Sequence, residues 1–258
     1  DEHITFDYCI GVSAGSANTA SYLAGQRGRN LRFYVDHLNE PGYMGIRNLL
    51  RTGQFFGLQY IYQTLTNSDG ADPIDYPAIM ANPAEFELVA TDAATGKPVY
   101  FTKDDMKQDD YRAIMASCAL PVMCRPISFK DQTYFDGGLS DSVPIMRAFA
   151  KGCDRVVVIL SKPRSFVKQP EGFRHIYRHA LRKYPQTIAA LDNRHLMYRQ
   201  NIADVKKQES AGKALVFAPS KELKMSTYAR DEKLEQELYD LGISDFDARL
   251  NELHTFLS

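Results

Sequence analysis

Residues 4–15 read ITFDYCIGVSAG, and this stretch decides the fold. Residues 4–10 alternate between apolar and polar positions and are rich in β-branched and aromatic side chains, which predicts a strand. Residues 11–15 match the pattern G-x-S-x-G and form a tight turn, and the small residues 16–23 are compatible with a helix. A strand that turns sharply into a helix around a serine is the context in which this pattern carries a nucleophile.

The residue types around Ser13 fit such a nucleophile. Gly11 and Gly15 lack Cβ atoms, so a strand and a helix can approach the turn closely. Ser13 is expected at a helix N-terminus, where free N–H groups and the helix dipole stabilise negative charge. The backbone amide of Ala14 is therefore the expected first donor to an oxyanion formed at this serine. The alternative is that Ser13 only caps the helix.

A serine nucleophile needs a group that accepts its proton. Asp136 is the candidate, because it ends an expected strand and precedes Gly137 and Gly138, which leave room beside the carboxylate. Asp69 is a rival, but it lies among turn residues with no strand before it, so a surface turn explains it. A carboxylate at its ordinary pKa is a weak base, so a Ser13–Asp136 pair predicts a partly buried, apolar site that raises this pKa.

Histidines leave a Ser-His-Asp arrangement open as an alternative. His195 lies on a stripe of apolar residues spaced three and four apart, which is typical of the buried face of a helix. His175 and His179 are four apart in a basic segment, as on an exposed helix face. No histidine has a loop setting that resembles a hydrolase histidine, and the full set is His3, His37, His175, His179, His195 and His254.

The composition is that of an ordinary globular protein. The 258 residues are 44% hydrophobic and 24% charged, which supports one large domain or two small ones with a sizeable core. A net charge of −1 gives no overall attraction to nucleic acid, so no nucleic-acid partner is expected. Nothing in the sequence indicates an oligomeric state. No apolar run is long enough to span a membrane and no signal peptide is visible, so we expect a cytoplasmic protein, with peripheral membrane contact as an open alternative.

The cysteines predict reduced thiols and no metal site. They lack the paired ligand spacing that zinc sites need, and a chain of this length does not depend on disulfides. The four are Cys9, Cys118, Cys124 and Cys153.

Strands and helices alternate along the chain, which predicts an α/β domain with a largely covered sheet. The change in character after Leu160 divides the chain into a core over residues 1–165 and a mostly helical extension over residues 166–258. The proline-containing segment 161–172 is the only expected linker. Further helices are expected at 31–38, 46–65, 109–119, 144–151, 173–210 and 229–256, hairpins at 85–102 and 127–135, and strands at 155–160 and 214–217.

Two segments suggest contact with lipid. Residues 55–65 carry four aromatic side chains, which fits an acyl-chain wall or a membrane-touching lid as well as an ordinary core helix. Residues 162–183 carry seven Lys or Arg and one Glu, which fits anionic headgroups as well as a solvated helix face.

The two motifs, G-x-S-x-G and then D-G-G, resemble those of the patatin-like phospholipases. Residues 116–121 (ASCALP), 136–144 (DGGLSDSVP) and 152–158 (GCDRVVV) also resemble segments of that family. The match covers residues 4–160, and residues 173–258 are similar to the C-terminal extension of some bacterial members.

The resemblance implies a three-layer fold, with a central, mainly parallel sheet flanked by helices. It also implies a lipid acyl hydrolase, either a phospholipase A or a carboxylesterase, that works without metal or organic cofactor. Ser13 would form an acyl-enzyme, and Asp136 would accept its proton and then activate water. In the family a glycine-rich oxyanion loop precedes the serine strand, whereas only twelve residues precede Ser13 here. The rest of the oxyanion hole is therefore expected upstream of Asp1. The alternative is a non-catalytic lipid-binding protein without a full oxyanion hole.

Overall fold

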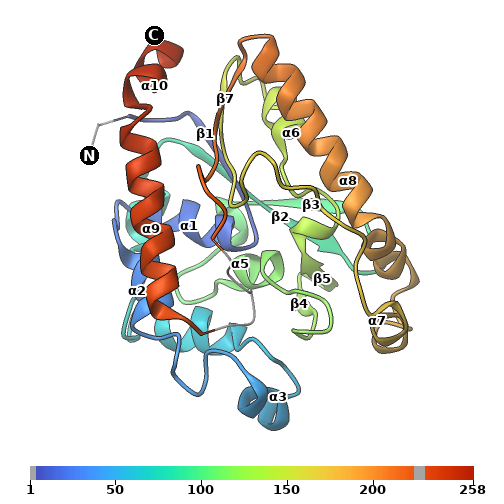
Figure 1. Cartoon of the computed structure of the whole chain (residues 1–258). Coiled ribbons are helices and arrows are strands. Elements are labelled where there is room, and N and C mark those ends of the chain that lie inside the picture. The colour runs from blue at the N-terminus through green and yellow to red at the C-terminus, as the bar shows by residue number, and fades with distance from the viewer. Residues whose placement is uncertain (1–3, 224–229) are drawn as a thin grey trace.

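A computed structural model describes residues 4–223 and 230–258, and Figure 1 shows a central sheet with helices packed around it. Apolar clusters cover both faces of this sheet, which confirms the α/β class. The strands of the sheet are β1 (Tyr8–Val12), β2 (Glu85–Asp92), β3 (Pro98–Thr102), β4 (Ile127–Phe129) and β5 (Gln132–Asp136).

The long strand β2 organises the sheet. Its residues 87–89 pair with both β1 and β3, so these two strands lie on opposite edges of β2. Its residues 90 and 91 pair with both β3 and β5, so β5 lies on the same edge as β1. Strand β1 is parallel to β2 and β5 is antiparallel, so their C-terminal ends converge where Val12 pairs with Val89 and Asp136 pairs with Ala90.

The strand directions differ from the expected mainly parallel sheet. Within the central sheet only β1 and β2 run parallel, whereas β3, β4 and β5 join through antiparallel pairings. The reason is local: the two expected hairpins form, and strands joined by short loops are antiparallel. Parallel pairing recurs in a separate two-stranded sheet of β6 (Val156–Ile159) and β7 (Ala214–Phe217).

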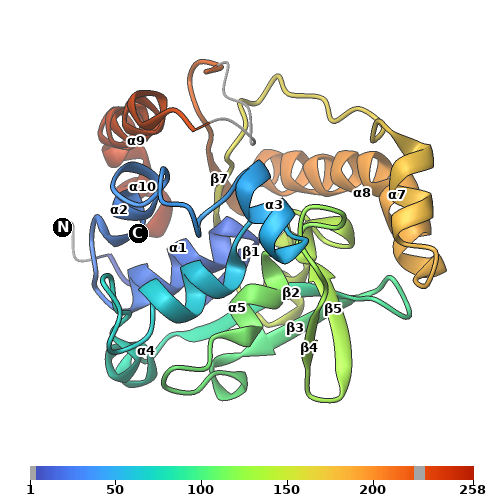
Figure 2. The same cartoon turned by 90° about the horizontal axis from the view of Figure 1, so that it is seen from below.

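One face of the central sheet is covered by α1 (Ala14–Leu23), α4 (Tyr76–Ala81) and α5 (Arg112–Ser117). Helix α5 is buried along almost its whole length, because residues 113–117 of its six are all inaccessible. Figure 2 shows α1 and α5 lying across the strands. The serine strand and the helix that follows it are therefore embedded in the largest apolar cluster of the described residues.

The other face is covered by helices that come later in the chain. The 26-residue α8 (Pro185–Ser210) and α7 (Arg174–Ala180) pack against Phe135 and Leu139, on either side of the aspartate. Helix α6 (Ile145–Ala150) packs against β6 and α8, and its Arg147 forms an ion pair with Glu87 of β2. The extension thus lies against the aspartate turn. Figure 1 shows α7 and α8 on the side of the sheet where β5 lies.

The remaining helices show where sequence patterns and structure differ. The expected helix 46–65 is two elements, α3 (Ile46–Thr52) and a π-helix, η1 (Tyr60–Leu65), because Gly53 adopts a φ of 74° that ends α3. The short α4 was not predicted. The helix expected at 31–38 is α2 (Arg29–Val35), which contacts α9 (Glu232–Asp247), and α10 (Leu250–Leu257) follows.

Residues 161–172 contain no helix or strand, in line with the expected linker, and the boundary at residue 165 stays a prediction. Within the two described ranges, no helix is both long enough and apolar enough to cross a membrane.

Candidate active site

Ser13 occupies a turn of a single residue between β1 and α1. Its φ of 54° and ψ of −129° are unfavourable for a residue with a Cβ atom, so the turn is strained. Helix α1 begins at Ala14, two residues earlier than the expected five-residue turn allows. The amide of Ala14 lies among the first N–H groups of α1, which have no acceptor within the helix. Its role as an oxyanion donor stays a prediction.

A buried serine holds the strained turn in place. The Oγ atom of Ser117, at the end of α5, accepts a 2.9 Å hydrogen bond from the backbone N–H of Ser13. The same hydroxyl donates to the carbonyl of Val89 at 2.6 Å and lies 2.7 Å from the hydroxyl of Ser16. The turn at Ser13 is therefore tied to β2, α1 and α5 at one point.

Two of the four motif glycines, Gly11 and Gly137, are required by their surroundings, and Gly138 is closely packed. A Cβ atom at Gly11 would lie 2.6 Å from the carbonyl oxygen of Gly15, and one at Gly137 would lie 2.1 Å from that of Val89. One at Gly138 would lie 3.0 Å from Oδ1 of Asp136, closer than most real Cβ contacts. A Cβ atom at Gly15 would meet nothing within 4 Å, so the expected packing reason for this glycine is wrong.

Asp136 is fully buried at the end of β5. Its Oδ1 atom accepts a 2.7 Å hydrogen bond from the backbone N–H of Gly138, and its Oδ2 atom accepts one of 2.6 Å from the hydroxyl of Ser13. Its own N–H donates to Ala119, and its carbonyl accepts from Thr91. The structure thus brings together the two side chains singled out in the sequence, and their catalytic role stays a prediction.

The electrostatics of the pair favour proton transfer. Burial raises the pKa of Asp136 above its ordinary value, and this outweighs the opposing effects of Ser13, Arg194 and the Gly138 N–H. A carboxylate with a raised pKa is a stronger base, so it accepts a serine proton more readily. Ser13 itself is half-buried, so solvent reaches one side of the pair.

The alternatives are not brought to this site. None of the histidines in the described ranges hydrogen-bonds to Ser13 or Asp136, and His3 lies outside those ranges. His37 bonds to Glu40 and Asp72 instead. The others are His175 and His179 on α7, His195 on the inner side of α8, and His254 on α10.

Asp69 is exposed within a turn, which confirms the surface-turn interpretation. The four cysteines are free, as expected, and no cluster of potential metal ligands occurs in the part of the chain that the structure describes.

The two segments with possible lipid contact differ in their surroundings. In residues 55–65, Leu58, Ile61 and Leu65 are buried and the aromatic side chains are half-buried, so this segment is mainly core. In residues 162–183, much of the positive charge is offset by acidic residues. The ion pairs are Arg164 with Glu209, Lys168 with Glu171, and Arg174 and Arg178 with Asp192.

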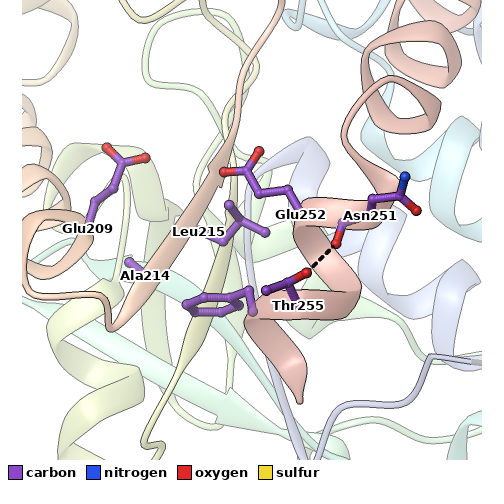
Figure 3. A pocket seen from close by; sticks show the side chains of 7 residues that line it. Glu209, Ala214, Leu215, Asn251, Glu252 and Thr255 are labelled. Atoms are coloured by element: carbon purple, nitrogen blue, oxygen red, sulfur yellow. Dashed lines mark hydrogen bonds between the residues drawn. The ribbon is translucent and has the colours of Figure 1, made fainter.

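A hollow in the structure lies away from the Ser13–Asp136 pair. It has a volume of about 530 Å³ and lies between β7, the end of α8 and α10 (Figure 3). Its lining side chains include Leu215 and Phe256, and Thr255 there bonds to a backbone carbonyl of its own helix. None of these groups is a nucleophile paired with a base.

Two residues of the site, Ser117 and Arg194, were not predicted from the sequence. Ser117 lies in a segment that resembles the family, and a polar residue at the end of a six-residue, largely apolar helix is the signal that could have revealed it. Arg194 lies on α8, where its Nε atom donates to the carbonyl of Gly138 at 2.8 Å. No local pattern distinguishes Arg194 from the other arginines of the extension.

Comparisons with known proteins show which family the chain belongs to. The family model described as patatin-like phospholipase matches residues 1–149, and a model described as a domain of unknown function, DUF6363, matches residues 184–258. The uncharacterized protein YjjU of Escherichia coli (strain K12) is 24% identical over 174 residues, which cover 67% of this chain and 48% of that protein. The chain thus spans about half the length of this curated relative. Because the first match covers more than half of the residues, the chain belongs to the patatin-like phospholipase family.

Proposed function

We propose that this chain is a serine lipid acyl hydrolase, a phospholipase A or carboxylesterase, that uses a Ser13–Asp136 dyad through an acyl-enzyme. The 2.6 Å hydrogen bond from the Ser13 hydroxyl to the buried Asp136 carboxylate supports this most directly. It joins a strained, half-buried serine to a base whose pKa is raised by burial. The family adds a lipid acyl substrate class to this chemistry.

Each step follows from the contacts of the two side chains. Asp136 takes the hydroxyl proton as the Ser13 oxygen attacks the ester carbonyl carbon and forms a tetrahedral intermediate. Its collapse breaks the ester C–O bond, and Asp136 returns the proton to the leaving alcohol. Water then attacks the acyl-enzyme carbonyl carbon as Asp136 accepts a proton from it. The bond between the acyl carbon and the Ser13 oxygen breaks, Asp136 returns the proton to that oxygen, and the carboxylic acid is released. The Ala14 amide is the proposed donor to both oxyanions.

The side chains next to the dyad favour an acyl group over a polar one. Cys118 follows Ser117 directly, and its thiol lies 3.3 Å from the hydroxyl of Tyr62 on η1. Burial raises the pKa of Cys118 and of Tyr62, so both stay neutral. We propose that this part of the segment 55–65 contacts the acyl chain near the scissile bond.

The test is hydrolysis of p-nitrophenyl esters by the full chain and by Ser13→Ala. Removing the nucleophile is expected to lower kcat by at least about 1000-fold. Ser210→Ala, at the exposed end of α8, is the matched control and keeps the parent rate. Equal rates in the parent and in Ser13→Ala contradict the proposal. Vesicle binding with no hydrolysis by the parent favours the non-catalytic, lipid-binding alternative.

We also propose that the chain meets its substrate at an anionic lipid surface through α3. This helix exposes 71% of Ile46 and 83% of Leu50, and Figure 1 shows it projecting at one end of the molecule. Arg47 and Arg51 are exposed beside them and have no ion-pair partner within the described ranges. Apolar side chains interspersed with arginines suit an interface between acyl chains and anionic headgroups.

Sedimentation with phosphatidylglycerol vesicles tests this surface. The double variant Ile46→Ser, Leu50→Ser is expected to bind at least about tenfold more weakly, because two apolar side chains no longer enter the interface. Ile159→Ser removes an isoleucine that is 82% exposed at the end of β6, and it serves as the control. Equal loss of binding in both variants contradicts a specific role for α3.

A further inference from the structure

Helix α8 carries an arginine that reaches the aspartate turn from outside the hydrolase motifs. The Nε atom of Arg194 donates to the carbonyl of Gly138 at 2.8 Å. A Cβ atom built on Gly138 would lie 3.0 Å from Oδ1 of Asp136 and 3.3 Å from Nη2 of Arg194. The guanidinium and the carboxylate therefore lie beside the same glycine, no farther apart than these two distances together.

Resting on the proposed dyad, we propose that Arg194 is a positioning residue, which fixes the turn after Asp136 and keeps a positive charge beside the buried carboxylate. The extension would then complete the active site rather than merely cover the fold. This role would be a specific function for α8, which lies within the part of the chain matched by the domain of unknown function.

The Gly138 peptide links the two groups mechanically. Its N–H donates to Oδ1 of Asp136, and its carbonyl accepts from both Arg194 and the hydroxyl of Ser142. Fixing the carbonyl fixes the plane of this peptide, and its N–H then holds the carboxylate in the orientation that leaves Oδ2 for Ser13. A loose turn would weaken the dyad even with both side chains present.

Within residues 4–223 and 230–258, Arg194 is the cation that acts on the Asp136 carboxylate. From α5 and the segment that follows it, Cys118 and Cys124 face the carboxylate as neutral thiols, because burial raises the pKa of each. From the serine turn comes only the Ser13 hydroxyl, and the backbone N–H of Gly138 completes the set. The positive charge of Arg194 opposes the effect of burial and favours the ionised, basic form of Asp136.

Neighbouring groups tune this charge. On its outer side Arg194 bonds to Glu171 at 3.1 Å, and Glu171 also pairs with Lys168 at 2.8 Å. Asp141, the next acid along the chain, interacts with Tyr100 and Asn201 instead. Glu171 therefore partly neutralises the positive charge of Arg194, and a change at Glu171 alters the same interaction between Arg194 and Asp136.

The pH dependence of Ser13 labelling by a fluorophosphonate tests the proposal. The labelling rate falls at low pH as Asp136 becomes protonated, and this part of the pH profile is its acidic limb. Removing the charge in Arg194→Gln raises the pKa of Asp136, so the acidic limb moves to higher pH. At a pH on that limb, labelling is expected to be about tenfold slower than in the parent. Glu171→Gln leaves the arginine less neutralised, so its limb moves to lower pH. Arg194→Lys keeps the charge and restores most of the parent limb position.

Arg199→Gln is the matched control, because Arg199 lies on the same helix and donates a hydrogen bond to the backbone carbonyl of Lys168 instead of to the aspartate turn. If Arg194→Gln is labelled more slowly but its acidic limb stays at the parent pH, the proposed effect of the arginine charge is wrong. If its whole pH profile equals that of the parent, the proposal is wrong. If Arg194→Gln does not fold, Glu171→Gln alone tests the proposal. An acidic limb of Glu171→Gln at the same pH as in the parent contradicts it.

A direct carbon-13 titration of Asp136, assigned with Asp136→Asn, separates this proposal from the proposed function. The titration reports the effect of Arg194 on the carboxyl group whether or not the chain hydrolyses esters. A shift in Arg194→Gln without any loss of hydrolysis in Ser13→Ala rejects the dyad but keeps the electrostatic contact.

Discussion

The serine turn and the aspartate turn end two strands that share one edge of β2, yet they are held in different ways. The serine turn is strained, with a φ of 54°, and the buried hydroxyl of Ser117 ties it into the core. The aspartate turn has an ordinary backbone, with a φ of −49° at Asp136, and is held by close packing on β2 and by Arg194. The turn at Ser13 is therefore held by the core, and the turn at Asp136 also by the extension.

The largest expected effect comes from filling the space under the aspartate turn. In Gly137→Ala the new Cβ atom would overlap the carbonyl of Val89, which belongs to the central strand and cannot move away cheaply. We expect a loss of about 4 kcal/mol in the free energy of unfolding, measured in urea. Gly172→Ala, where a Cβ atom meets nothing within 4 Å, is the control. A loss below about 1 kcal/mol shows that the turn is not closely packed.

The glycines of the serine turn are expected to differ from each other. Gly11→Ala places a Cβ atom 2.6 Å from the backbone of α1 and should cost about 2–3 kcal/mol. Gly15→Ala lies inside α1 with open space beside it and should be neutral or stabilising by up to about 1 kcal/mol. Thermal or urea unfolding of the pair measures this difference, and equal losses contradict the described packing.

Ser117→Ala tests how the core holds the nucleophile. The variant removes the acceptor for the Ser13 N–H and leaves the Val89 carbonyl without its donor, so we expect a loss of about 1–2 kcal/mol. Ester hydrolysis should fall by at least about tenfold, because the strained turn relaxes. A stability loss with an unchanged kcat indicates that Ser117 supports the fold only.

The smallest expected effect is a gain in stability. The pKa of Asp136 is raised in the folded chain, so folding is opposed above the unfolded pKa, and stability recovers as pH falls through the folded pKa. Asp136→Asn removes this cost, so its Tm at pH 8 should equal or exceed that of the parent. The advantage should disappear at low pH. A lower Tm at pH 8 and an unchanged one at low pH contradict the raised pKa.

The local arrangement of Ser13 and Asp136 could be predicted from the sequence, because short motifs determine it. Gly11, Ser13 and Asp136 stand next to strands with clear patterns, and a sharp strand-to-helix turn needs just these residue types. The hairpins after residues 85 and 127 were also predictable, since turn residues separate short β-rich runs. Their consequence for strand direction was missed, because it depends on which edge of β2 each strand joins.

The long-range parts of the site could not be predicted in the same way. Ser117 and Arg194 act through tertiary contacts with residues 104 and 56 positions away, and a single sequence carries no periodic signal for such pairs. The expected helix 46–65 is divided because Gly53 has a positive φ. A glycine permits this backbone conformation but does not require it, so the sequence does not predict the break. The basic segment 162–183 looked unpaired because its acidic partners Asp192 and Glu209 lie beyond it.

The most direct test of the account is covalent labelling of Ser13 by a fluorophosphonate in the parent and in Asp136→Asn, with the modified peptide identified by mass spectrometry. If Asp136 is the base, the parent is labelled at Ser13, and the rate falls about 100- to 10,000-fold in a variant that remains folded. Labelling at another residue, or equal rates at Ser13 in both proteins, contradicts the dyad.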